Sequence, residues 1–381
     1  MRHQNSVFHA LLKQVPWSVF DKLVDEHRAD RGVRRLTTKG QFVALLYGQL
    51  AGAASLREIE TAMTSHGARL YHLGGDEISR STLADANATR PHEVFGKLFS
   101  AMAGRAGRGL RRATQGAVRL IDSTGIRLAG IASDWARFSN DVRGAKAHVV
   151  YDPDAEAPLY LAVTPARVND IVAARAMPVE PGATYVFDLG YYDFAWWARL
   201  DEAGCRIVTR LKANTPLADV EERALPEGSS LSYDRVGLLP ARQAAARKNP
   251  LDKRVREIGV VLDDGRTMRV VSNDLQAPAQ DIADLYKRRW AIELFFRWVK
   301  QTLRIKHFIG RSENAVRIQI AVAMIAYLLL RLAHDAVKII PTLLAFSRLV
   351  RANLMHRRDL RHIAKPPEIP KPDTKQLALV L

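Results

Sequence analysis

Residues 284–308 carry two different stripes along one predicted helix, and no other segment constrains the fold as strongly. The apolar stripe comprises Leu285, Ile292, Phe296, Val299 and Leu303, at spacings of seven, four, three and four residues. Because an α-helix turns by about 100° per residue, these side chains share one side of the helix. A stripe of this kind faces a protein core, so the segment must pack against other elements.

A polar ridge runs beside the apolar stripe. It comprises Tyr286, Arg289, Glu293 and Lys300, which fall within an arc about 60° wide. Arg297 and Arg304 project near the same ridge. A carboxylate among cations suits a metal ion next to a nucleic-acid phosphate. Arg289 and Glu293 could also form a simple i,i+4 pair on a solvated helix face.

Composition narrows the class of protein. The chain has 381 residues, enough for two or three domains, and a formal net charge of +17 that favours a nucleic-acid partner over a membrane surface. Cys205 is the single cysteine, which excludes a disulfide framework and a cysteine zinc site. We expect no signal peptide, because the first 17 residues lack its apolar core, and no membrane span, because the apolar run 320–330 is too short. We therefore expect a cytoplasmic protein.

Local patterns divide the chain into five regions. We expect a helical DNA-binding domain at 1–110, the first part of an α/β core at 111–205, a β-rich insertion at 206–278, a core helix at 279–310, and a helical C-terminal region with a flexible tail at 311–381. Strands are predicted at 117–121, 125–129, 147–151, 159–163, 185–187, 207–211, 231–237, 254–262 and 268–272, and a helix at 169–177.

The first region contains two short helices that could read DNA. Ser55 to Glu58 form a capping box, and Ser81 opens a second helix after the turn at Gly74–Gly75. With Arg80 and Arg90 beside it, this pair fits either a helix-turn-helix-like DNA reader or a plain helical bundle. The Gly- and Arg-rich stretch 104–112 is interpreted as a basic linker, because it lacks the surroundings of a nucleotide-binding loop.

Two aspartates follow predicted strands in the core. Asp122 follows AVRLI, and Asp188 follows TYVF. A lone aspartate after a strand is usually a turn or helix cap, but Glu293 could complete a cluster of three. Carboxylates without His or Cys suit Mg²⁺ or Mn²⁺. Two such ions about 4 Å apart would activate a water or a 3′-hydroxyl and stabilise the leaving oxygen at phosphorus.

These residues resemble a known family. The spacing of Tyr286, Arg289, Glu293 and Lys300 matches Y-x2-R-x3-E-x6-K, and the contexts IDST and FDLGYYDF match around the two aspartates. The blocks GAKAHVVYD, VTRLKANTP, SLREIE, YHLG and STLADAN are also similar, so the resemblance covers about residues 5–310. The chain thus resembles the bacterial insertion-sequence transposases of the DDE class, in the branch with this signature (the IS-four family).

The resemblance implies a ribonuclease-H-like core interrupted by the β-rich insertion. It implies cut-and-paste transposition, with cleavage at inverted-repeat ends, a hairpin intermediate and strand transfer into target DNA. Asp122, Asp188 and Glu293 would bind two Mg²⁺ ions, which Mn²⁺ could replace. The partners would be double-stranded DNA and a second copy of the chain that the C-terminal helices help to bind, with no nucleotide cofactor.

The remaining roles also come from the resemblance. Tyr286 and Arg289 would hold a phosphate, Lys300 would contact the DNA backbone, and Trp290 would stack near a flipped base or pack at the helix edge. Arg297 is a further candidate for DNA binding because it projects near the same ridge. Lys146 and His148 share one strand face and could point at the site, although a histidine there is more often a core residue. Relatives that form hairpins can use a Trp in the insertion, but here no Trp lies between Trp197 and Trp290, and Tyr233 is the only aromatic residue in the insertion's strands.

Two other functions remain open. A structure-selective endonuclease on the same fold would cleave DNA without joining strands. A DNA-binding protein that has lost catalysis would bind ends without cleaving them.

Overall fold

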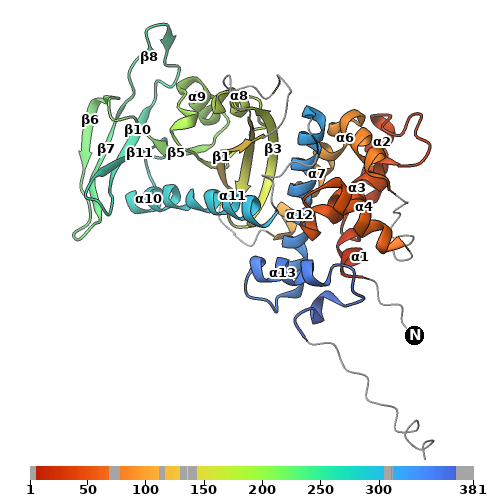
Figure 1. Cartoon of the computed structure of the whole chain (residues 1–381). Helices are drawn as coiled ribbons and strands as arrows, with labels where there is room; N and C mark the ends of the chain where they lie inside the picture. Colours follow the sequence, from red (N-terminus) through yellow and green to blue (C-terminus); the bar gives the residue numbers. More distant parts are fainter. Residues whose placement is uncertain are drawn as a thin grey trace, which may run out of the picture.

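A computed structural model describes residues 6–67, 78–110, 116–128, 135, 144–303, 310 and 312–365. The Gly74–Gly75 turn, the YHLG block, Arg304 and the expected tail beyond Lys365 lie outside these residues. The described chain has a helical body, a central sheet with helices on both faces, and an extension of that sheet at the far end (Figure 1).

One nine-stranded sheet joins the core to the insertion, in the order β3-β2-β1-β4-β5-β11-β10-β7-β6. Its strands are β1 (Val118–Arg127), β2 (Gly144–Asp152), β3 (Ala157–Pro165), β4 (Thr184–Val186), β5 (Arg206–Arg210), β6 (Ala218–Arg223), β7 (Leu231–Leu238), β10 (Arg254–Val261) and β11 (Thr267–Ser272). The short strands β8 (Arg242–Ala244) and β9 (Arg247–Lys248) pair with each other. β1 to β3 form an antiparallel meander, whereas β1, β4 and β5 are parallel.

Two sequence-based boundaries differ from the structure. The strands expected at 117–121 and 125–129 are a single strand, β1, because the polar residues between them stay paired with β2. The strand expected to open the insertion is β5, which pairs in parallel with β4 and therefore belongs to the core. The insertion continues the same sheet through β11, which is antiparallel to β5.

Side chains of the central strands alternate between two cores. Ile121, Tyr185 and Phe187 pack on the face covered by α8 (Asp170–Arg175) and α9 (Phe194–Glu202). Leu120 and Val186 point to the other face, where α10 (Ala279–Arg288) and α11 (Trp290–Thr302) lie (Figure 1). This period of two is the strand repeat, and it buries both faces of a mixed α/β fold, as expected from the sequence.

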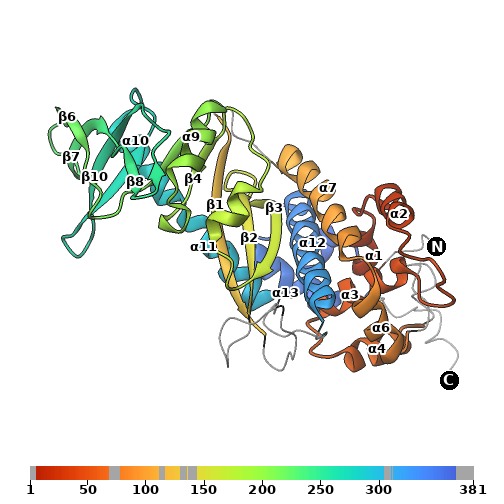
Figure 2. The same cartoon turned by 90° about the horizontal axis from the view of Figure 1, so that it is seen from above.

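The helical body is built from both ends of the chain. It contains α1 (Val7–Leu12), α2 (Trp17–Glu26), α3 (Thr38–Ala51), α4 (Leu56–Ser65), α6 (Arg80–Thr89), α7 (His92–Leu110), α12 (Glu313–Val337) and α13 (Leu343–Asn353). Both views place α7 and α12 between the sheet and the other N-terminal helices (Figures 1 and 2).

The expected basic linker is helical over much of its length. Residues 104–110 form the end of α7, where Ala106 and Leu110 are buried at helical spacing. A Cβ on Gly107 would lie 2.8 Å from the Leu159 side chain of β3, so this glycine permits close packing of α7 on the sheet. The glycines that indicated a linker therefore serve helix–sheet contact.

α12 is the central helix of the body. It is the one helix in the described part of the chain that is long and apolar enough to cross a membrane, but 83% of its apolar window is buried inside the protein. Burial of this kind is typical of a core helix, as expected for the run 320–330. Tyr327 donates a hydrogen bond to the carbonyl of Glu156 at 2.8 Å, which ties α12 to the turn between β2 and β3.

Candidate active site

Two aspartates lie at the same level of neighbouring strands. Leu120 of β1 pairs with Val186, the last residue of β4, and Asp122 and Asp188 follow two residues later in each case. Equal offsets from a parallel pair bring the two side chains together where β4 ends. Asp122 does not stand at a strand end as expected, because β1 continues beside β2 beyond it.

Glu293 comes from α11, and Arg289 connects it to Asp122. Nη2 of Arg289 lies 2.5 Å from Oε1 of Glu293, and Nη1 lies 3.6 Å from Oδ2 of Asp122. Arg289 is the residue between α10 and α11, so the single helix expected here is divided at this arginine. The i,i+4 pair exists, but the same guanidinium also faces a core aspartate and is only 17% exposed.

The three carboxylates share one electrostatic environment. Burial raises the pKa of Asp122 to about 7, and the negative charges of Asp188 and Glu293 shift it in the same direction. The backbone N–H of Ser123 and the guanidinium of Arg289 oppose this shift. A cluster of this kind requires a cation, and Arg289 supplies one here.

The side chains of the cluster are chemically suited to bind a divalent metal ion. Three carboxylates offer the hard oxygen ligands that Mg²⁺ and Mn²⁺ prefer. Within the described ranges, no three His, Cys, Asp or Glu side chains already converge as a metal site. Because Arg289 lies between Asp122 and Glu293, binding of a metal there requires this arginine to change partners.

A fourth carboxylate, Asp170, lies beside the cluster, although an aspartate at the start of the helix expected at 169–177 would ordinarily be a helix cap. Its Oδ1 accepts hydrogen bonds from Ser123 Oγ at 2.7 Å and from Lys146 Nζ at 3.1 Å. Asn169, not Asp170, occupies the N-cap position of α8. Asp170 could have been identified by its position in the first turn of α8, the helix that follows β3, opposite the polar face of β2.

Lys146 and His148 lie on that face of β2, as predicted, but they differ in access to solvent. Lys146 is half-buried and also bonds the carbonyl of Val168. His148 is 1% exposed, with its Nε2 at 2.8 Å from Thr164 Oγ1. Burial lowers the pKa of His148 to about 4, so the ring is neutral near pH 7. His148 therefore lies beneath the site, and it offers no charge to a DNA backbone.

Gly190 permits the approach of two carboxylates. Its backbone N–H donates to Oδ1 of Asp188 at 2.8 Å. A Cβ at this position would lie 3.0 Å from Oδ1 of Asp188 and 3.2 Å from Oδ2 of Asp170. The glycine in FDLGYYDF is thus explained by space next to the two aspartates.

The rest of the predicted ridge surrounds Arg289 on α10 and α11. Tyr286 is buried, and the Arg289 guanidinium lies 5.8 Å from the centre of its ring. Trp290 is 51% exposed and therefore does not simply pack at the helix edge, and Arg297 lies 5.8 Å from its ring. Lys300 is half-buried on the last turn of α11. Trp290 also lines a cavity of about 420 Å³ between α10 and the insertion strands.

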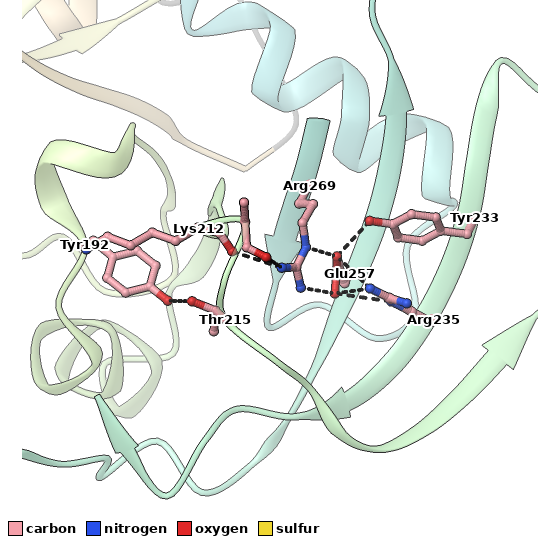
Figure 3. Close-up of polar contacts among 8 residues, drawn as sticks. Tyr192, Lys212, Thr215, Tyr233, Arg235, Glu257 and Arg269 are labelled. Carbon is pink, nitrogen blue, oxygen red and sulfur yellow. Dashed lines mark hydrogen bonds and ion pairs between the residues drawn. The ribbon is translucent and has the colours of Figure 1, made fainter. Parts of the chain in front are cut away.

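A second charged cluster, which the sequence did not reveal, lies in the insertion (Figure 3). Glu257 of β10 is fully buried and accepts hydrogen bonds from Arg235 and Arg269. Nη1 of Arg269 also donates to the carbonyls of Lys212 and Ala213 at 2.9 Å. Through these bonds Glu257 fixes the segment after β5, where the Lys212 ammonium lies 4.6 Å from the ring centre of Tyr192.

Tyr233, the aromatic residue of the insertion strands, belongs to the same cluster. Its hydroxyl donates to Oε1 of Glu257 at 2.8 Å, and the Arg235 guanidinium lies 4.4 Å from its ring centre (Figure 3). One face of the ring is therefore covered by Arg235. The geometry explains Tyr233 as part of the support for Glu257.

Comparison with known proteins is consistent with this arrangement. Residues 113–329 match the family described as the transposase DDE domain, and residues 3–75 match a domain of unknown function (DUF4372). The matched DDE segment contains all three carboxylates of the cluster.

Two relatives cover most of the chain. A protein of Sinorhizobium fredii (strain NBRC 101917 / NGR234), y4zB, whose name describes a transposase, is 42% identical over 75% of this chain and 80% of its own length. A protein of Geobacillus stearothermophilus, named as a transposase of insertion sequence element IS5377, is 31% identical over 72% of each chain. The fold is also similar to that of piggyBac transposase in a synaptic complex with hairpin DNA, with a TM-score of 0.50, 10% identity, and coverage of 100% of this chain and 87% of that one.

Proposed function

This chain belongs to the DDE transposases of bacterial insertion sequences, and from that premise we propose that Asp122, Asp188 and Glu293 bind the divalent ions of its active site. The chain is a DNA-cleaving and strand-transferring enzyme. The observation that carries the metal proposal is that one guanidinium, that of Arg289, lies between Asp122 and Glu293, while Asp188 lies at the level of Asp122 beside the neighbouring strand. We propose Mg²⁺, replaceable by Mn²⁺, with two ions per site.

The reaction we propose is cut-and-paste transposition in the branch with the Y-x2-R-x3-E-x6-K signature. When bound, the ions would activate a water or a 3′-hydroxyl and stabilise the leaving oxygen at phosphorus. Arg289 would then leave the carboxylates for a DNA phosphate, where it remains close to Tyr286. Double-stranded inverted-repeat ends and target DNA are the proposed substrates.

DNA contacts are proposed for the exposed side of α11. Trp290 is exposed and Arg297 lies beside its ring, so the two offer stacking and charge on one surface. Lys300 follows on the same helix and Lys146 lies deeper, next to Asp170. These positions support contact with the strand that enters the carboxylate cluster.

We further propose that two copies act together and that the enzyme works in the cytoplasm, where the DNA of a bacterial element lies. The C-terminal helices were expected to contribute to the contact between copies. Because α12 is largely buried within its own chain, the region around α13 is the better candidate. Ile339 is 61% exposed and Leu344 38% exposed there.

Cleavage of a supercoiled plasmid carrying the element with its flanking ends tests the metal proposal. We expect excision at the ends in Mg²⁺, none in EDTA, and loss of activity in Glu293→Gln. Glu227→Gln, which changes an exposed loop carboxylate in the same way, should cleave like the unmodified protein. Unchanged cleavage by Glu293→Gln would disprove the carboxylate site.

The same assay separates the two alternative functions. A structure-selective endonuclease would cut without preference for the element ends and would yield no joined products. A binding protein without catalysis would bind the ends with every divalent ion and cleave with none.

A further inference from the structure

A groove in the N-terminal body is lined by arginines. The loop between α2 and α3 contributes Arg28, Arg31, Arg34 and Arg35, and α6 forms the facing side. The groove has a volume of about 830 Å³. We call these four residues and the facing side of α6 the arginine groove.

The charge of the groove is unbalanced. The four loop arginines are exposed, and none of them makes an ion pair with any residue that the structure describes. The four loop arginines face one lining carboxylate, that of Asp85, while Arg90 at the base is already paired with Asp30. Clustered positive charges without carboxylate partners favour an anionic ligand. On an ordinary solvated surface, arginines are more often spread apart or paired with carboxylates.

The loop that carries the arginines is held in place. Oδ1 of Asp30 accepts hydrogen bonds from the backbone N–H and the hydroxyl of Thr38, both at 2.7 Å. Arg90, which is 8% exposed, bonds Asp30, Thr38 and the carbonyl of Leu36. Because Arg90 is also the C-cap of α6, the loop and the helix form one rigid unit. Arg90 thus supports the groove from within, although the sequence placed it beside a DNA-reading helix.

α6 presents a polar side to the groove. Thr82, Asp85 and Thr89 are exposed and line it together with the buried Ala86, whereas Leu83 and Asn87 are buried and do not line it. Short polar side chains on an exposed helix can approach base edges closely in the major groove of DNA. The arginine loop lines the same groove beside them.

We propose that the arginine groove binds the phosphate backbone of duplex DNA and that α6 faces the bases. This inference rests on the proposed function and assigns a role to the arginine loop, which lies within the match to a domain of unknown function at residues 3–75, and to α6, which follows that match. The phosphodiester chain is the favoured occupant because it supplies regularly spaced negative charges to several arginines at once.

Full-length protein and duplexes with and without the element end test the proposal. We expect the combined variant Arg31→Gln, Arg34→Gln and Arg35→Gln to lose affinity for both duplexes by a similar factor. The slope of log Kd against log salt should fall by about 0.9 for each phosphate that the variant no longer neutralises. Arg199→Gln, an exposed arginine of α9, is the control and should retain both affinity and slope.

Asp85→Asn tests the groove by a gain of DNA affinity, which a misfolded variant would not show. Removing the one carboxylate that lines the groove should tighten binding to unrelated duplex DNA severalfold at low salt, and high salt should abolish the gain. Unchanged affinity in both the arginine and the Asp85 variants would overturn the proposal and would leave an acidic protein segment as the ligand to consider.

Cleavage distinguishes this outcome from failure of the proposed function. If Glu293→Gln abolishes cleavage and the groove variants bind normally, the active-site proposal stands and the groove proposal fails. If no metal supports cleavage by the unmodified protein but the groove variants lose binding, the groove proposal stands and the active-site proposal fails.

Discussion

At the scale of single residues, His148 should make the free energy of unfolding depend on pH. Its folded pKa of about 4 lies below the value of about 6.5 for an unfolded histidine, so the unfolded state binds the proton more tightly. The free energy of unfolding should therefore be highest above pH 6.5 and decrease as the pH falls toward 4. The full shift corresponds to about 3 kcal/mol.

His148→Gln should remove this part of the pH dependence, because glutamine does not titrate. Urea unfolding at pH 7.5 and pH 5 would measure it. A decrease in the variant as large as that in the unmodified protein would assign the dependence to another group.

Gly190 is the residue whose replacement should affect the carboxylates most directly. Gly190→Ala would place a methyl group 3.0 Å from Asp188 Oδ1, which forces that carboxylate to shift. Because a misplacement of catalytic groups by about 1 Å can cost about 100-fold in rate and the shift needed here is smaller, we expect cleavage to fall by up to about tenfold. Plasmid cleavage and thermal unfolding should be measured together, with Gly96→Ala as the control in an open position of α7. Normal cleavage would show that Asp188 tolerates a methyl group at position 190.

At the scale of elements, the Glu257 cluster holds the insertion strands and the segment after β5. Removing one partner of a buried ion pair leaves an uncompensated charge, which costs about 3–5 kcal/mol. Glu257→Gln should destabilise the protein by an amount of this order, as measured by urea unfolding. Glu222→Gln on the edge strand β6 changes an exposed carboxylate and should change stability little. Equal effects of the two substitutions would show that the buried pairs have no special role.

The helices and strands also show which parts of the fold could be predicted from the sequence. Periodicity placed the apolar side of α11 and most strands of the sheet, because burial of one or both faces leaves a repeating pattern. It did not separate β5 from the insertion, because a ladder partner that is distant in sequence leaves no local signal. For the same reason the Glu257 cluster, which joins three insertion strands, was not predicted. The cluster of Asp122, Asp188 and Glu293 was predicted from their positions after strands and on a helix and from the resemblance. The position of Asp170 beside it was missed because a helix-opening aspartate has an ordinary local explanation.

At the scale of the whole molecule, α12 joins the helical body to the catalytic sheet. Leu328 is fully buried in the large core that α12 shares with the N-terminal helices and one face of the sheet. Arg317 donates to the carbonyl of Val163 at 2.7 Å, and Arg331 pairs with Glu156 at 3.2 Å, so α12 contacts the sheet directly. We therefore expect the body and the sheet to unfold together.

Leu328→Ala tests this coupling, because truncating a fully buried leucine costs about 2–5 kcal/mol. Hydrogen exchange should accelerate both in α3 of the body and in β3 of the sheet, by similar factors, since a shared core transmits the loss to both. Leu344→Ala, at a half-exposed position on α13, should affect neither. Acceleration confined to the helical body would mean that the sheet is stable alone, and that the two ends of the chain form a body able to move independently of the active site.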